Sequence, residues 1–199
     1  MRWQRSSRES QRKINEIKLY EYGNQIDMEF VVLSREHKEI AQRFKCNNEY
    51  IDKFVKEIAW KDKGTVTYAV IDNEENRIVT IMTLVASGIY TVHSNNSRRP
   101  NIVLPAVEIK NFATDIRYQK IPMTEEEGTT LSKMIFSKYL RDILELSKNT
   151  IGINKIVLYS VDQALNFYKC FGFKDFKSYM ARSEDYAIKG CTPMYMNVI

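Results

Sequence analysis

The sequence predicts a mixed α/β fold built around one central sheet. Segments with helical periodicity alternate with segments rich in β-branched and aromatic residues, in the order β-α-α-β-β-β-α-β-α-β-β. Residues 65–92 have the pattern of an antiparallel hairpin, and the short apolar run 153–159 is typical of a central parallel strand. A chain of 199 residues without an internal repeat is long enough to bury one core, so we expect a single domain.

The N-terminal part of the predicted domain contains one strand and two helices. Residues 28–33 are expected to form the strand, and residues 35–44 carry apolar side chains at helical spacing. A second helix with a wide apolar face is expected over residues 50–58. Asn47 or Asn48 can cap its N-terminus, because a side-chain amide oxygen can accept from a free backbone N–H there.

The remaining elements alternate between strands and helices. The expected strands are residues 65–71, 78–92, 102–116, 153–159 and a C-terminal pair from Phe173 onward. The expected helices are residues 130–146 and 163–171. Gly172 follows the second of these helices, where a glycine can supply the left-handed cap.

Positive charge is concentrated at the N-terminus. Residues 1–13 carry +4 of the formal net charge of +5, which leaves only +1 for residues 14–199. We therefore interpret residues 1–25 as a basic appendage and residues 26–199 as the single domain. A pI near 9 does not by itself indicate a nucleic-acid-binding protein when one short segment produces most of it.

Several classes of protein are not expected from this composition. Apolar runs such as residues 78–86 are far shorter than the ~20 residues that span a bilayer, and no apolar signal region follows Met1. The three cysteines, Cys46, Cys170 and Cys191, are widely spaced and form no metal or redox motif. We expect a cytoplasmic protein with reduced thiols and no bound metal.

Tyr168 is the candidate catalytic residue. It lies in a short helix that follows the parallel strand 153–159, where Phe167 and Phe171 are expected to be buried. Open α/β sheets bind ligands near the carboxyl ends of such strands, and a buried phenol requires a polar partner. A role as proton donor follows for Tyr168.

These residues resemble the last conserved region of the GNAT N-acetyltransferases, which is a strand, a short helix containing Phe-Tyr, and then Gly-Phe. The opening Phe44-Lys45-Cys46-Asn47-Asn48 is similar to the Phe-x-Cys-Gly-Asn of the GNAT toxins of bacterial toxin/antitoxin pairs. Ala113-Thr114-Asp115 resembles the Ala-x-Asp that ends their fourth strand, and Met194-Tyr195-Met196 resembles their final strand. The resemblance covers residues 26–199.

The resemblance implies a GNAT fold with a mixed sheet of six to seven strands and helices on both faces. In this fold a bulge splays the fourth and fifth strands and exposes backbone groups to the pantetheine arm of acetyl-CoA. The cofactor-binding positions that it implies are Phe112, Ala113, Thr114, Arg117, Tyr118, Gln119, Gly128, Thr129 and Asn166.

The loop expected to hold the pyrophosphate departs from the family pattern Tyr-Gln-Gly-x-Gly-x-Gly-x-x-Leu. The segment from Gln119 to Leu131 is four residues longer, and only Gly128 has a counterpart among the pattern's glycines. Three glutamates at 125–127 would oppose a pyrophosphate unless Arg117 or Lys120 offsets them. Either this loop holds acetyl-CoA in its own way, or the scaffold binds something else.

The resemblance implies an acetyl-CoA-dependent N-acetyltransferase that transfers the acetyl group to a primary amine. In this reaction Tyr168 would protonate the departing thiolate. Members of the toxin branch acetylate the amino group of aminoacyl-tRNA, for which Arg98 and Arg99 are candidate substrate-binding residues. Glu108 is a candidate base or acceptor-binding residue, or an outward-facing strand carboxylate balanced by Lys110.

Two alternatives stay open from the sequence. The protein could acetylate a small molecule or a protein amino terminus, or it could be a GNAT-fold binding module that has lost acetyl-CoA. The resemblance also implies an antitoxin and a second copy of the chain as candidate partners.

Overall fold

The computed structural model describes residues 16–21, 24–91, 102–122, 129–176 and 190–198. Its described strands form one eight-stranded sheet in the order β1-β2-β3-β4-β5-β6-β8-β7. The strands are β1 (Glu16–Glu21), β2 (Asn24–Val32), β3 (Val66–Asp72), β4 (Arg77–Thr91), β5 (Ile102–Thr114), β6 (Lys155–Ser160), β7 (Lys174–Asp175) and β8 (Thr192–Asn197). Only β5 and β6 pair in parallel; the other neighbouring strands are antiparallel.

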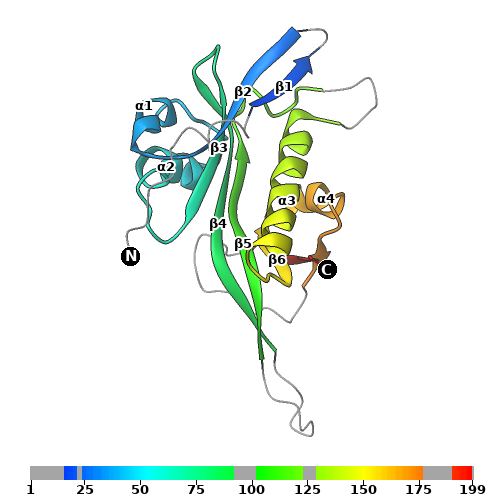
Figure 1. Cartoon of the computed structure of the whole chain (residues 1–199). Helices are drawn as coiled ribbons and strands as arrows, with labels where there is room; N and C mark the ends of the chain where they lie inside the picture. Colours follow the sequence, from blue (N-terminus) through cyan, green and yellow to red (C-terminus); the bar gives the residue numbers. More distant parts are fainter. Residues whose placement is uncertain (1–15, 22–23, 92–101, 123–128, 177–189, 199) are drawn as a thin grey trace, which may run out of the picture.

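Helices cover both faces of the sheet (Figure 1). They are α1 (Lys38–Ala41), α2 (Glu49–Glu57), α3 (Leu131–Asn149) and α4 (Leu165–Lys169), with short 3-10 turns η1 (Arg35–His37) and η2 (Asp162–Ala164). Figure 1 shows α1 and α2 on one face and α3 and α4 on the other. No helix in the described ranges has the length and apolar character needed to cross a membrane. The predicted α/β class, with one mixed sheet between helical layers, is confirmed.

The sheet has more strands than the expected six to seven. Part of the excess comes from β1, which pairs with β2 along its whole length, from Glu16 opposite Glu29 to Glu21 opposite Asn24. These residues were assigned to the basic appendage. Ile17 and Leu19 are two residues apart, which is the period of a strand and not of a helix. The other short addition is β7, which covers two residues.

Two predicted helices are shorter in the structure. Regular α-helix within residues 35–44 is limited to α1, preceded by the turn η1. Within residues 163–171 it is limited to α4, preceded by η2. The predicted caps are present: the Asn48 side chain accepts from the Ile51 N–H, and Gly172 has a φ of +88°.

A bulge in β5 separates two strands at the centre of the sheet. Thr83 of β4 lies opposite Asn111, but the next residue, Leu84, lies opposite Ile109, so Lys110 is the extra residue. On the other side of β5, the pairing with β6 ends at Ile109 opposite Leu158. The rest of β5 has no pairing with β6, and this is the predicted splay. The splayed strands, expected as the fourth and fifth, are β5 and β6 in the structure because β1 adds one strand before them.

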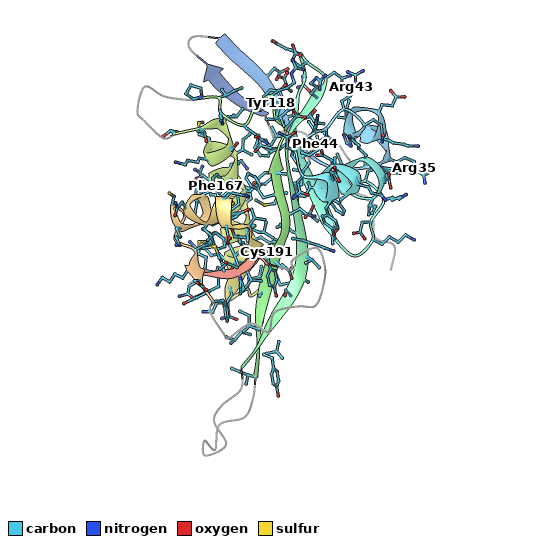
Figure 2. The ribbon with its side chains drawn as sticks, turned by 180° about the vertical axis from the view of Figure 1, so that it is seen from behind. Arg35, Arg43, Phe44, Tyr118, Phe167 and Cys191 are labelled. Atoms are coloured by element: carbon cyan, nitrogen blue, oxygen red, sulfur yellow. The ribbon has the colours of Figure 1, made fainter. Side chains whose placement is uncertain are left out.

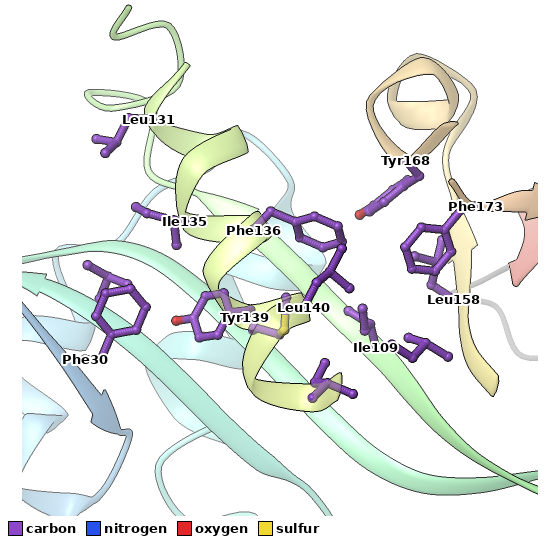
Figure 3. Close-up of a cluster of buried hydrophobic side chains, with 14 of the residues drawn as sticks. Phe30, Ile109, Leu131, Ile135, Phe136, Tyr139, Leu140, Leu158, Tyr168 and Phe173 are labelled. Atoms are coloured by element: carbon purple, nitrogen blue, oxygen red, sulfur yellow. The ribbon is translucent and has the colours of Figure 1, made fainter. Parts of the chain in front are cut away.

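The two faces of the sheet have different cores. Beneath α3 and α4 lies an aromatic cluster centred on Phe136, whose ring centroid is 4.8 Å from Phe112 and 4.8 Å from Phe171. Figure 3 shows the rings of Phe136, Tyr168 and Phe173 facing one another between the helices. Beneath α1 and α2 the buried side chains are mainly aliphatic, together with Phe44 and Phe54. The splayed strands lie between these two layers.

Candidate active site

Two adjoining pockets lie over the splayed strands and form one cleft. They share five lining residues, Asn48, Ile51, Phe112, Ala164 and Tyr168. The first, which we call the Glu108 pocket, has a volume of about 210 Å³ and also includes Tyr159 and Cys191. The second, which we call the Lys120 pocket, has a volume of about 390 Å³ and also includes Thr114, Gln119 and Thr130. The cleft therefore has two differently lined halves that meet at Tyr168.

Tyr168 is held in the cleft by aromatic packing. Its ring centroid lies 5.5 Å from Phe136, 5.3 Å from Phe167 and 5.9 Å from Phe173, and its side chain is only 8% exposed. Gly172 allows the chain to turn directly after α4, so that the Phe173 N–H bonds the Tyr168 carbonyl at 3.3 Å. This turn brings Phe173 back against α4, where its ring packs beside Tyr168.

The chemistry of the Tyr168 hydroxyl suits a proton donor. Burial raises the pKa of Tyr168, and the nearby Cys191 raises it further, so the phenol is protonated at neutral pH. Within the described part of the chain the hydroxyl has no hydrogen-bond partner. It is therefore free to donate to a ligand in either half of the cleft.

The opposite wall of the cleft is the loop 45–48 and the start of α2. The carboxylate of Asp115, which directly follows β5, accepts the Lys45 N–H at 2.9 Å and the Arg117 N–H at 3.0 Å. The Ile116 N–H in turn donates to the Lys45 carbonyl at 2.8 Å. Asp115 of the Ala-x-Asp motif thus ties this wall to the end of the splayed strand.

Local geometry completes this wall. Asn47 has a φ of +66°, the left-handed conformation, and it stands where the resembled toxin motif has glycine. The Cys46 N–H donates to Asp52 at 2.7 Å, which closes the loop onto α2. Burial and the hydrogen bond with Asp52 raise the pKa of Cys46 to about 12, so this residue is a thiol and not a nucleophilic thiolate at neutral pH.

The Glu108 pocket combines a half-buried carboxyl with an unpaired amide. Burial raises the pKa of Glu108, although Lys110 nearby favours its charged form. Burial and the proximity of Glu108 also raise the pKa of Tyr159. Asn111 is 7% exposed, and its amide nitrogen has no hydrogen-bond partner among the described residues. This half of the cleft could hold a polar group of modest size.

The Lys120 pocket is lined by hydroxyl and amide groups. The Thr114 and Ser132 hydroxyls lie 3.0 Å apart, and Thr130 caps α3 by accepting the Lys133 N–H at 3.4 Å. Gln119 donates to the Thr114 carbonyl at 3.0 Å and to the Cys46 carbonyl at 3.3 Å, which links the two walls. No carboxylate lines this pocket in the described part of the chain, and the three glutamates at 125–127 lie outside that part.

Several of the residues chosen from sequence come together in this cleft. Phe112, Ala113, Thr114, Gln119 and Tyr168 line it, and Glu108 lines the half named after it.

Arg117 and Tyr118 were expected to bind the cofactor but lie outside the cleft lining. Arg117 pairs with Glu75 at 3.3 Å, and the buried Tyr118 hydroxyl donates to Asp72 at 2.9 Å. In Figure 2, Tyr118 lies toward the β1–β2 end of the sheet, away from Phe167 and Cys191. Both side chains are engaged at the end of the β3–β4 hairpin and do not reach the cleft lining.

The other expected positions contribute no described contact to the cleft. Asn166 is an exposed residue of α4 that lies outside both linings, and Thr129 is absent from them too. Nearby in the sequence, Gln163 and Thr130 line the Lys120 pocket. Arg98, Arg99 and Gly128 lie outside the described residues.

Sequence reasoning missed part of the cleft. Asn48 and Ile51 line both halves, and Asn111, Tyr159 and Gln163 line one half each. Asn48 carried a signal, because it belongs to the motif similar to Phe-x-Cys-Gly-Asn. Tyr159 and Gln163 lie at the end of β6 and in the turn after it, which is where a ligand was expected.

Comparison with known proteins shows a clear structural likeness. The sequence matches no protein-family model and no curated protein. A solved structure described as a bacterial toxin superposes with a TM-score of 0.64 at 19% identity, covering 87% of this chain and 92% of the other. AtaTR bound with AcCoA gives a TM-score of 0.60 at 18% identity, with 86% and 94% covered.

A third structure, AtaT complexed with acetyl-methionyl-tRNAfMet, gives a TM-score of 0.63 at 18% identity and covers 86% of this chain and 95% of the other. At this level of identity the likeness concerns the fold. The chain shares the fold of these toxin structures.

Proposed function

We propose that this protein is an acetyl-CoA-dependent N-acetyltransferase that acetylates a primary amine. The observation that carries the proposal is the separation of β5 from β6 beside Tyr168. Beyond Ile109 the edge of β5 that faces β6 pairs with no strand among the described residues, so backbone groups there, other than the Thr114 carbonyl that accepts from Gln119, are available to an extended ligand. The pantetheine arm of CoA carries amides that could pair with such an edge.

The Lys120 pocket fits the phosphate-bearing end of this substrate. It lies on the α3 side of the shared residues and contains Thr130, which caps that 19-residue helix. Among the described residues its lining includes the cationic Lys120 and no carboxylate, which favours an anion. The Glu108 pocket, on the other side of Tyr168, is then left for the amine.

Bound acetyl-CoA would supply the acetyl group as a thioester. The acceptor nitrogen forms a C–N bond to the acetyl carbon while the C–S bond breaks. Glu108 takes the proton that the amine loses, and Tyr168 gives its proton to the thiolate. Burial keeps the Tyr168 phenol protonated and makes the Glu108 carboxyl a stronger base than an exposed one.

The acceptor that we favour is an α-amino group. Such a group has a pKa of about 8 and deprotonates near neutral pH far more readily than a lysine with a pKa of about 10.4. The likeness to AtaT complexed with acetyl-methionyl-tRNAfMet supports aminoacyl-tRNA as the carrier of this amine. In that case residues 26–199, together with the added strand β1 and the start of β2, would be the catalytic domain, acting in the cytoplasm, with an antitoxin as its regulating partner.

The decisive experiment is thermal unfolding with and without acetyl-CoA. A ligand at 100 times its Kd stabilises by ~2.7 kcal/mol, which for a domain of this size raises the Tm by about 5 °C or more. Tyr168→Phe should show the same shift, with turnover lower by about a hundredfold or more. No shift at millimolar acetyl-CoA, in either protein, would overturn the proposal and favour a binding module.

A second measurement identifies the acceptor. The protein is incubated with labelled acetyl-CoA and either aminoacyl-tRNA, a free amino acid amide or a peptide. Transfer to aminoacyl-tRNA alone would support the toxin-like reaction. Transfer to the small amine or the peptide with unmodified tRNA would keep the enzyme class and replace its substrate.

A further inference from the structure

We propose that Lys120 binds the diphosphate of CoA, in a segment that departs from the glycine-rich pattern of the resembled family. The inference rests on the proposed function and adds to it a side chain that recognises a phosphate. Three features of the Lys120 pocket motivate it. Most N–H groups in the first turn of α3 already have partners, Lys120 is the one cation in the described lining, and the backbone is held by hydrogen bonds on both sides of Lys120.

The first feature is that the N-terminus of α3 offers few free donors. The N–H of Leu131, the first residue of the helix, donates to the Ile121 carbonyl at 3.0 Å. The N–H of Lys133 donates to the Thr130 side chain. Of the first three N–H groups, only that of Ser132 has no partner among the described residues. Backbone amides alone would therefore give a diphosphate little neutralisation.

The second feature is the charge of the lining. Lys120 is the only cationic side chain among the described residues that line this pocket. Its neighbour Arg117, the other cation that the sequence suggested, is engaged with Glu75 outside the cleft. Phosphate oxygens form stronger hydrogen bonds with a charged donor than with a neutral one, so the ammonium of Lys120 is the strongest phosphate ligand available there.

The third feature is that Lys120 sits on a fixed piece of backbone. On one side, the Gln119 amide is bound to two carbonyls, those of Thr114 and Cys46. On the other side, the Leu131 N–H holds Ile121, and Pro122 forms a β-bridge with Thr130. An exposed lysine on a fixed backbone loses less conformational entropy when it binds than one on a free loop.

The test compares three ligands and three variants by calorimetric titration. CoA carries the diphosphate and a 3′-phosphate, dephospho-CoA keeps only the diphosphate, and pantetheine has neither. Lys120→Ala removes the charge, Lys120→Arg keeps it, and Arg117→Ala removes a nearby exposed cation outside the cleft. Each Kd is measured at two salt concentrations, because screening weakens a charge contact.

We expect Lys120→Ala to raise the Kd for CoA and dephospho-CoA alike by about tenfold and to flatten the salt dependence. Pantetheine binding should be unchanged, Lys120→Arg should be near the unmodified protein, and Arg117→Ala should have no effect on any ligand. Stronger loss for CoA than for dephospho-CoA would overturn the assignment to the diphosphate. Unchanged CoA binding in Lys120→Ala would overturn the role of Lys120 and leave the proposed function standing. Failure of the unmodified protein to bind CoA would overturn both.

Discussion

The two walls of the cleft are built by different forces. On the α4 wall, Tyr168 is enclosed by the rings of Phe136, Phe167 and Phe173. On the α2 wall, the loop 45–48 is held by backbone hydrogen bonds to two carboxylates, Asp115 and Asp52. Packing thus positions the proposed proton donor, and directional polar contacts position the surface opposite to it.

This difference sets how each wall should respond to damage. An aromatic cluster loses several kcal/mol when a central ring is removed, because both burial and close contacts are lost. A wall held by hydrogen bonds loses ~1–3 kcal/mol for each buried group left without a partner. The α4 wall should therefore govern global stability, and the α2 wall should govern the local shape of the cleft.

The largest effect on stability is expected for Phe136→Ala. Phe136 is fully buried and contacts the rings of Phe112, Tyr168 and Phe171. Its removal should lower the free energy of unfolding by about 3–5 kcal/mol in a urea titration. Phe136→Leu should lose much less, and a loss below about 1 kcal/mol in the alanine variant would contradict packing as the force that holds this wall.

Tyr168→Phe should separate chemistry from packing on the same wall. The hydroxyl has no partner in the described part of the protein, so its loss should leave the unfolding free energy nearly unchanged. Turnover of acetyl-CoA should fall by about a hundredfold or more if this hydroxyl is the proton donor. Tyr159→Phe, in the same cleft, provides the control and should keep most activity. Equal rates in both variants would remove Tyr168 from the mechanism.

Asp115→Ala tests the α2 wall. The substitution leaves the Lys45 and Arg117 N–H groups without their acceptor and should cost about 2 kcal/mol. Because the loop that it holds lines both pockets, the Kd for acetyl-CoA should rise as well. Asp115→Asn keeps one acceptor oxygen, so its loss of unfolding free energy should be about half of the loss in Asp115→Ala. A rise in Kd without loss of stability would show that the carboxylate acts on the ligand instead.

The smallest effect is expected for Glu108→Gln. Since burial raises the folded-state pKa of Glu108, the folded protein binds a proton more tightly than the unfolded chain does. Stability should therefore decline as the pH rises from below 4.5 through the folded-state pKa. Glu108→Gln should remove this decline and be slightly more stable at neutral pH. An unaltered pH profile of the Tm would indicate that Glu108 is solvated and not part of the pocket interior.

The sequence predicted those elements whose signals are local. The Asn48 cap and the Gly172 turn follow from the conformations that these residue types prefer, and the hairpin of β3 and β4 follows from its apolar runs and polar turn. β1 was missed because six residues with two aliphatic side chains carry little periodic signal.

Contacts between distant turns could not be predicted in this way. Asp115 and Lys45 are 70 residues apart, and Tyr118 and Asp72 are 46 apart. A turn residue has no periodicity that shows which way it faces. This is why Arg117 and Tyr118 were expected in the cleft, while the contribution of the loop 45–48 to both pockets was not seen.

The extra residue in β5 also limits how the length of this chain can vary. Ile109 and Phe112 are three residues apart and still pack in the same aromatic layer, because Lys110 interrupts the alternation between them. Deletion of Lys110 would restore the alternation, and each residue of β5 after this point would then face the opposite side of the sheet. Phe112 would face the α1–α2 side, where Ala113 now packs, and Ala113 would face the aromatic cluster. A related chain could replace many side chains here and keep the cleft, whereas a chain shorter by one residue at this point would be expected to lack it.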